Sequence, residues 1–203
     1  MVQPGRRRDG GSAGWFLCQS CNGIVGRFDE EFVRWLKMLV MEWPNTAARR
    51  SGESRVGVFP AVRPGAFIRS VLGGMFALNP TLRPRYPEIA TAILTGEPAA
   101  LPIDLSLLMS LYRGDIRYVL GRTTVVETGA QGKSLAVNLQ SEWAWPPFHL
   151  ALADASGLRR WPDAMNISAW FVDEPKNVRD VPSVLGVLDE MDLSTAHLGR
   201  VGT

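Results

Sequence analysis

The hydrophobic pattern changes its period near residue 116, and this change limits the fold more than any other feature of the 203-residue chain. Before that point, apolar residues recur at helical spacing, as in DEEFVRWLKMLVMEW from Asp29 and RPGAFIRSVLGGMFALNP from Arg63. After it, segments such as KSLAVNLQ and SEWAWPPFHLALAD alternate or form short apolar runs, which is typical of strands. Helices followed by strands predict an α+β fold, with N-terminal helices packed on a C-terminal antiparallel sheet.

The individual elements follow from the same pattern. One helix is expected from Asp29 to a stop at Pro44, and a second from Pro64 to Asn79. RYPEIATAILTGEP and DLSLLMSLYRGD are predicted as two shorter helices, each ending at a glycine. RVGVFPAV, IRYVLGRTTVVETG, MNISAWFV and VPSVLGVLD are predicted as strands. The pair Gly73-Gly74 weakens its helix by about 1 kcal/mol per glycine, so we expect another backbone to approach closely there.

Composition indicates a globular chain with a hydrophobic core, because 46% of the residues are hydrophobic and 21% are charged. Three parts are expected: a flexible basic arm at 1–13, a Cys-x-x-Cys knuckle with its helix at 14–55, and an α+β body at 56–203. The longest apolar run, 71–78, is too short to span a bilayer, and no signal peptide is visible. A cytoplasmic protein without a membrane partner is therefore expected.

Positive charge is concentrated at the front of the chain. Residues 1–50 carry eight basic and five acidic side chains, whereas residues 121–203 carry seven and ten. A positive front could attract a phosphate backbone, although a GC-rich genome would produce the same excess of arginine. The candidate nucleic-acid-binding residues are Arg6, Arg7, Arg8, Arg27, Arg49 and Arg50.

Cys18 and Cys21 are separated by two residues, a spacing that lets one tight turn present both sulfurs to a tetrahedral metal. They are the only cysteines in the chain, so together they fill half of a zinc shell. A zinc site here would be incomplete, with further ligands from a partner, His149, His197 or the acidic segment 189–192. The alternative is a pair of free thiols packed as small hydrophobic groups.

The string LCQSCNGIVGRFDEEFVRWL, residues 17–36, resembles the C-terminal half of the zinc-knuckle HNH endonuclease domain. Cys18 and Cys21 match the second half of that knuckle, and Asn22 matches the position just after it. The later segments RPGAFIRSVLGGMFALNP and SEWAWPPFHLALAD are similar to the body that follows the knuckle in a group of bacterial HNH-associated proteins. The resemblance could therefore cover most of the chain.

The resemblance implies a ββα-metal fold in which a histidine activates water and one divalent cation stabilises the scissile phosphate. In that family the first Cys-x-x-Cys and the catalytic histidine precede the knuckle. The seventeen residues before Cys18 contain neither histidine nor cysteine. We therefore expect a protein that binds DNA or RNA but is catalytically incomplete as given. Only together with an upstream half would the protein need a divalent cation and cleave nucleic acid. Two explanations account for the missing half: the sequence is a fragment of a longer protein, or the nuclease half has been lost.

Two further features support other hypotheses. His149 is the one catalytic candidate, and it lies within reach of Glu142 if the chain bends at Pro146 and Pro147; a structural role is the alternative. Trp143 and Trp145 share a strand face and could stack on bases, line a protein interface or belong to the core. The second functional class is therefore an interaction or assembly module, which binds another protein or a second copy without nucleic-acid chemistry.

Overall fold

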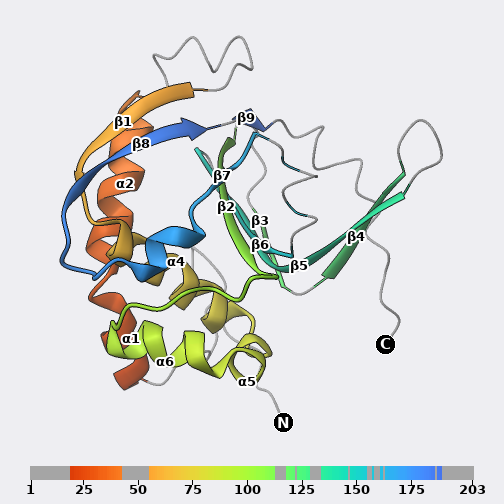
Figure 1. The fold of residues 1–203 in the computed structure, drawn as a ribbon, viewed down its shortest axis with the longest axis horizontal. Helices are drawn as coiled ribbons and strands as arrows, with labels where there is room; N and C mark the ends of the chain where they lie inside the picture. The colour runs from red at the N-terminus through yellow and green to blue at the C-terminus, as the bar shows by residue number, and fades with distance from the viewer. Residues whose placement is uncertain are drawn as a thin grey trace, which may run out of the picture.

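The computed structural model describes residues 19–42, 55–112, 118–121, 123–128, 134–145, 147–154, 157, 161, 163–185 and 187–188. In this part of the chain, helices lie against one face of a seven-stranded sheet, and a separate two-stranded ribbon crosses over them (Figure 1). The predicted α+β class is confirmed.

The helical elements are α1 (Gln19–Gly26), α2 (Asp29–Glu42), α4 (Pro64–Leu78), α5 (Leu82–Arg85), α6 (Pro87–Thr95) and the 3-10 turn η2 (Ser168–Val172). Two predicted helix starts are confirmed. Helix α2 begins at Asp29 with three acids in its first turn, which favours that end of the helix dipole. Helix α4 begins at Pro64, whose fixed φ suits the first helical position. Helix α6 ends at Gly96, which adopts a left-handed φ of 81°.

The strands are β1 (Arg55–Val62), β2 (Ser106–Tyr112), β3 (Tyr118–Leu120), β4 (Thr123–Thr128), β5 (Ser134–Trp145), β6 (Phe148–Ala153), β7 (Met165–Asn166), β8 (Arg179–Leu185) and β9 (Val187–Leu188). The large sheet has the order β3-β5-β6-β2-β7, with β4 paired to β5 and β9 paired to β2. Neighbouring strands are antiparallel except for the short parallel pair of β2 and β9. Strands β1 and β8 form the separate antiparallel ribbon.

Two sequence predictions of local structure are wrong. The segment DLSLLMSLYRGD was expected to be helical, but its residues Ser106–Tyr112 form the central strand β2. A short apolar run fits either a buried helix or a strand covered on both faces, and periodicity alone does not separate the two. The segment MNISAWFV was expected to be a strand. Only its first two residues pair with β2, and Ser168–Val172 form η2.

The core divides into two clusters, one on each face of the sheet. On the first face, Phe148 and Leu150 of β6 pack with buried residues of α2 and α4. Trp35 of α2 is fully buried there, with its ring centroid 4.7 Å from that of Phe67 and 5.2 Å from that of Trp170. The second face holds a smaller cluster, made of Leu108, Val137, Leu139, Ala151, Ala153 and Trp161.

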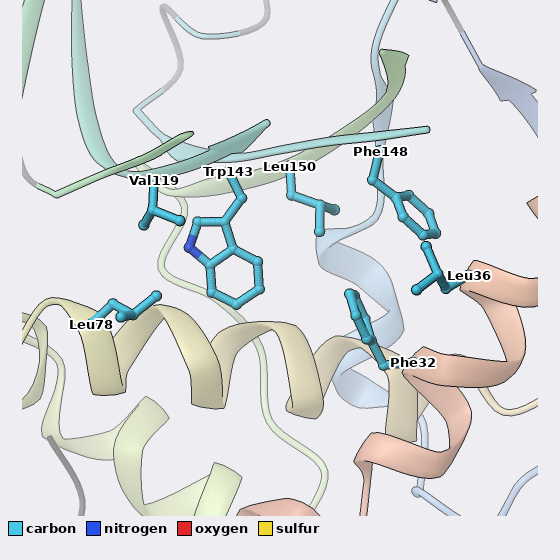
Figure 2. Close-up of a pocket in the computed structure, with 7 residues that line it drawn as sticks. All are labelled: Phe32, Leu36, Leu78, Val119, Trp143, Phe148 and Leu150. Carbon is cyan, nitrogen blue, oxygen red and sulfur yellow. The ribbon is translucent and has the colours of Figure 1, made fainter. Parts of the chain in front are cut away.

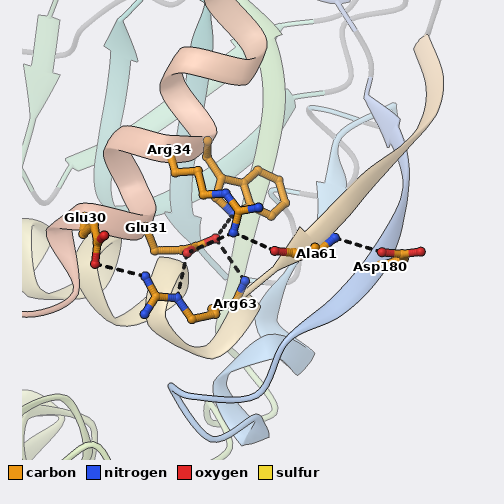
Figure 3. A network of polar contacts seen from close by, with 7 residues as sticks. Glu30, Glu31, Arg34, Ala61, Arg63 and Asp180 are labelled. Carbon is orange, nitrogen blue, oxygen red and sulfur yellow. Dashed lines mark hydrogen bonds and ion pairs between the residues drawn. The ribbon is translucent and has the colours of Figure 1, made fainter.

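The ribbon of β1 and β8 is attached to α2 through the buried carboxylate of Glu31 (Figure 3). Glu31 accepts hydrogen bonds from the indole of Trp35 at 3.2 Å and from the backbone and side chain of Arg63 at 3.0 and 2.9 Å. A buried carboxylate is tolerated only when its oxygens are satisfied in this way. The network therefore fixes where β1 leaves the ribbon and α4 begins.

Candidate functional site

Much of the predicted nucleic-acid and zinc surface lies outside the described residues. This is the case for Arg6, Arg7, Arg8, Arg49, Arg50, Cys18, His197 and the acidic segment 189–192. The basic arm at 1–13 lies there too. The structure does place Arg27, Cys21, Asn22 and His149.

Arg27 contacts the protein itself. Its Nη2 donates a hydrogen bond of 3.0 Å to the carbonyl of Leu94, in the last turn of α6. Its guanidinium also lies 4.7 Å from the centroid of the Phe28 ring. A cation at this position satisfies a terminal carbonyl and complements the helix dipole. Arg27 therefore closes the C-terminus of α6.

Three other arginines from the first seventy residues also make internal contacts. Arg34 donates to the carbonyl of Ala61 at 2.6 Å, and Arg63 is bound by Glu31, whose hydrogen bond raises the pKa of Arg63. Arg69 is fully buried and donates to the carbonyls of Gly65 and three residues further along the chain. Burial lowers the pKa of Arg69 to about 10. In the described part of the front half, much of the positive charge thus stabilises the fold.

Cys21 and Asn22 lie within helix α1, where a tight turn was expected to present the two sulfurs. The described residues contain no group of three or more histidine, cysteine or acidic side chains that could hold a metal ion. His149 cannot complete a site at α1, because α1 packs on α4 over the first sheet face and His149 points from the second. The described residues therefore do not fit a four-ligand zinc site.

The predicted proximity of His149 and Glu142 is confirmed. The chain turns at Pro147 between β5 and β6, and His149 Nε2 lies 2.8 Å from Glu142 Oε1. The two side chains are 0% and 3% exposed, so a substrate has no access to them in this conformation. His149 also contacts the ring of Trp161, with centroids 5.0 Å apart. The geometry is that of an enclosed polar pair inside the second sheet face.

An apolar groove lies between the sheet and the helices (Figure 2). Its volume is about 380 Å³. The groove is lined by Phe32, Leu36, Leu78, Val119, Trp143, Phe148 and Leu150. Leu78 and Val119 are 41% and 48% exposed, so the groove has an apolar rim open to solvent.

Trp143 supplies the one polar atom of note in the apolar groove. In Figure 2 its indole nitrogen lies on the side of the ring facing Val119 and Leu78. This Nε1 is buried and has no hydrogen-bond partner among the described residues. A buried indole N–H normally finds an acceptor, because leaving it unpaired costs free energy. The side chain of Trp145, which was predicted to share a strand face with Trp143, is not among those that the structure describes.

The two adjacent glycines of α4 explain how Trp143 reaches this position. A Cβ at Gly74 would overlap the Trp143 ring, and a Cβ at Gly73 would overlap the side chain of Val25. Close approach was expected here, but the approaching groups are side chains and not a backbone. A second hollow of about 340 Å³ lies next to the apolar groove and shares Phe32 and Trp143 with it.

Comparison of the chain with protein-family models, curated proteins and solved structures found no match. The resemblance to the HNH family therefore rests on the sequence motif at residues 17–36. Among the helices that the structure describes, none is both long and apolar enough to cross a membrane.

Proposed function

We propose that the chain is a protein-binding module and that its apolar groove takes an apolar segment of a partner protein. The supporting observation is that seven apolar side chains share one hollow with a buried indole N–H that lacks an acceptor in the described part. A peptide offers both complements at once. Its apolar side chain would fill the hollow, and its backbone carbonyl would accept from Trp143.

The rim of the groove supports the same proposal. Val33, Leu78 and Val119 are exposed apolar residues that line the apolar groove or the adjoining hollow. Single exposed apolar residues are common, but exposed apolar residues at the edges of neighbouring hollows are typical of an interaction site. Covering these side chains would release ordered water and favour binding.

The direct test is a titration with the peptide acetyl-Leu-Phe-Leu-amide, followed by NMR at the indole N–H resonance of Trp143. The W143F variant assigns that resonance. We expect a saturable downfield shift, because the indole N–H gains an acceptor, and no shift with the polar peptide acetyl-Ser-Asn-Ser-amide. The rim variant Leu78→Glu should weaken binding of the apolar peptide by about tenfold or more, because it places a charge against the apolar ligand.

Two results would overturn the proposal. A Trp143 resonance that does not respond to the apolar peptide would exclude this ligand class. Self-association in sedimentation velocity that Leu78→Glu abolishes would assign the groove to a second copy of the chain. Val178→Glu, at an apolar side chain that is 60% exposed and does not line the groove, serves as the charge-matched control.

We also propose, as a second candidate, an HNH-related protein that binds DNA or RNA through its basic front. Support comes from the motif at residues 17–36 and from the excess of positive charge in residues 1–50. The candidate contacts are Arg6, Arg7, Arg8, Arg49 and Arg50. Metal-dependent phosphodiester hydrolysis belongs to this proposal only together with an upstream half.

Retention on immobilised DNA and RNA across a salt series tests this second candidate. Binding should weaken steeply with salt, because phosphate contacts release counterions. Replacing the five arginines by glutamine should flatten that dependence, whereas the Arg83→Gln/Arg85→Gln control should leave it unchanged. Retention that is absent at low salt, or equal in all variants, would exclude it. Arg27 is left intact in these variants because it closes α6.

A further inference from the structure

The three acids in the first turn of helix α2 differ in their partners. Glu30 Oε2 lies 3.3 Å from Arg63 Nη2, and Glu31 Oε2 lies 2.9 Å from Arg63 Nε. Asp29 contacts a neutral group instead, because its Oδ1 accepts a hydrogen bond of 2.7 Å from the hydroxyl of Ser70 on α4. Among the described residues, no cation forms an ion pair with Asp29. The charge of this carboxylate is therefore not neutralised within the described part of the chain.

Asp29 lies in the wall of the adjoining hollow, which shares Phe32 and Trp143 with the apolar groove and has a volume of about 340 Å³. Among the described side chains that line either hollow, Asp29 is the only charged one. Ser70 is 7% exposed, so the hydroxyl that holds Asp29 comes from inside the protein and keeps the carboxylate at the hollow. The two neighbouring hollows thus form a largely apolar surface with one negative charge, on the side of the adjoining hollow.

We propose that the partner segment that enters the apolar groove carries a lysine, and that this lysine occupies the adjoining hollow and pairs with Asp29. The proposal rests on the proposed function, because it names the chemistry of the segment that the groove takes. A lysine side chain has two parts that match the hollow. Its aliphatic stem can cover Phe32 and Val33, and its ammonium group can donate to the carboxylate of Asp29.

Charge complementarity favours lysine over other side chains at this position. An acidic side chain would be repelled by Asp29, and no described cation lines the hollow to offset the repulsion. An apolar side chain would remove water from the carboxylate without replacing the lost hydrogen bonds. An arginine fork binds best to both oxygens of a carboxylate, whereas Oδ1 of Asp29 already accepts from Ser70. A lysine needs only one oxygen.

The test is an NMR titration of the full chain with acetyl-Leu-Phe-Leu-amide and with the same peptide extended by one lysine at either end, so that both chain directions in the groove are covered. The backbone amides of Phe32 and Val33 report binding. At low ionic strength, one lysine peptide should bind about threefold to fivefold more tightly than the neutral peptide. This advantage should disappear at about 1 M salt, which screens exposed charges. A glutamate in place of the lysine should weaken binding.

Two variants assign the advantage to Asp29. Asp29→Asn removes the charge but keeps an oxygen that accepts from Ser70, so it should fold normally, bind the neutral peptide as before and lose the preference for lysine. Glu88→Gln is the matched control, since Glu88 is also an exposed acid in the first turn of a helix but lines neither hollow. It should keep the full preference. Thermal unfolding checks that both variants are folded.

The outcomes separate this inference from the proposed function. If the neutral peptide binds and neither lysine peptide binds more tightly, the lysine is wrong while the groove remains a peptide site. A lysine advantage of equal size in Asp29→Asn would also overturn the inference, because it would place the lysine elsewhere. If no peptide binds, both proposals fail. Self-association in sedimentation velocity that Asp29→Asn weakens would overturn the choice of a separate partner and assign the hollow to a second copy.

Discussion

His149 Nε2 lies 2.8 Å from Glu142 Oε1, inside the sheet face that points away from helix α4. They belong to adjacent strands, and their alternation places both opposite the aromatic side of the core. Ser110, directly across from His149 on β2, is also fully buried. Ser110 Oγ and His149 Nδ1 have no hydrogen-bond partner among the described residues. The contact with Glu142 is therefore the one that satisfies the buried Nε2 of His149 among the described residues.

Replacing Glu142 by alanine should lower the free energy of unfolding by about 3 kcal/mol, because His149 Nε2 would remain buried without a partner. Urea denaturation of E142A, H149A and the double variant measures the coupling. The double variant should lose less than the sum of the single losses. Glu30→Ala, at a side chain that is 83% exposed, is the control and should change stability by no more than about 0.5 kcal/mol. Additive losses would contradict the assigned pairing.

Ala61 is a non-glycine residue with a left-handed φ of 49°, at the irregularity between Phe59 and Val62 in the β1–β8 ribbon. Its N–H donates to Asp180 at 2.8 Å and its carbonyl accepts from Arg34 at 2.6 Å, so both backbone groups hold this conformation (Figure 3). Ala61→Gly should stabilise the fold by about 0.5 to 1 kcal/mol, because glycine adopts this φ without strain.

Thermal unfolding of Ala61→Gly measures this gain. Ala90→Gly in the regular helix α6 is the opposite control and should cost about 1 kcal/mol or more. A loss of stability in both variants would show that Ala61 carries no backbone strain.

Gly74→Ala should destabilise the chain even though alanine is the better helix former. The new methyl group would overlap the Trp143 ring, and overpacking of this kind costs about 1 to 3 kcal/mol against a propensity gain near 1 kcal/mol. Gly23→Ala in α1 is the matched control. A Cβ there meets no atom within 4 Å, so it should gain up to about 1 kcal/mol. Urea midpoints compare the two, and equal gains would contradict the contact.

Arg69→Met should be among the most damaging single changes in the described part of the chain. Its guanidinium donates to Gly65 at 2.8 Å and to Asp173 at 2.9 Å, and it also bonds the carbonyls of Glu97 and Phe171. Methionine keeps the volume but leaves buried carbonyls without donors, at a cost of about 3 kcal/mol or more. Chemical denaturation measures the loss. Arg83→Met, at an exposed site of α5, should have almost no effect.

The sequence predicted the elements whose signals are local. Helix α2 follows from its acidic start and from Trp35 and Leu39 at helical spacing, and both are buried. The approach of His149 to Glu142 followed from the prolines between their strands. Strand β2 was missed because Leu107 to Leu111 are buried on both faces, which removes the alternation that marks a strand. The position of the apolar groove could not be predicted from the sequence, for a different reason.

The apolar groove is assembled from residues distant in the chain. The apolar groove needs Phe32, Leu78 and Val119 around one hollow, and no periodicity encodes that arrangement. The glycine pair at 73 and 74 was the available signal, since it indicated close packing against α4. It did not say that Trp143 would fill the space.

The ribbon of β1 and β8 has a consequence for synthesis on the ribosome. Ala61 and Asp180, which hydrogen-bond across it, are 119 residues apart. At translation rates of about 5 to 20 residues per second, β1 waits roughly 6 to 24 s for its partner strand. During that time its open edge can pair with other nascent chains. A premature stop anywhere before residue 179 would leave that edge permanently unpaired, so truncated products should be early clients of chaperones and proteases.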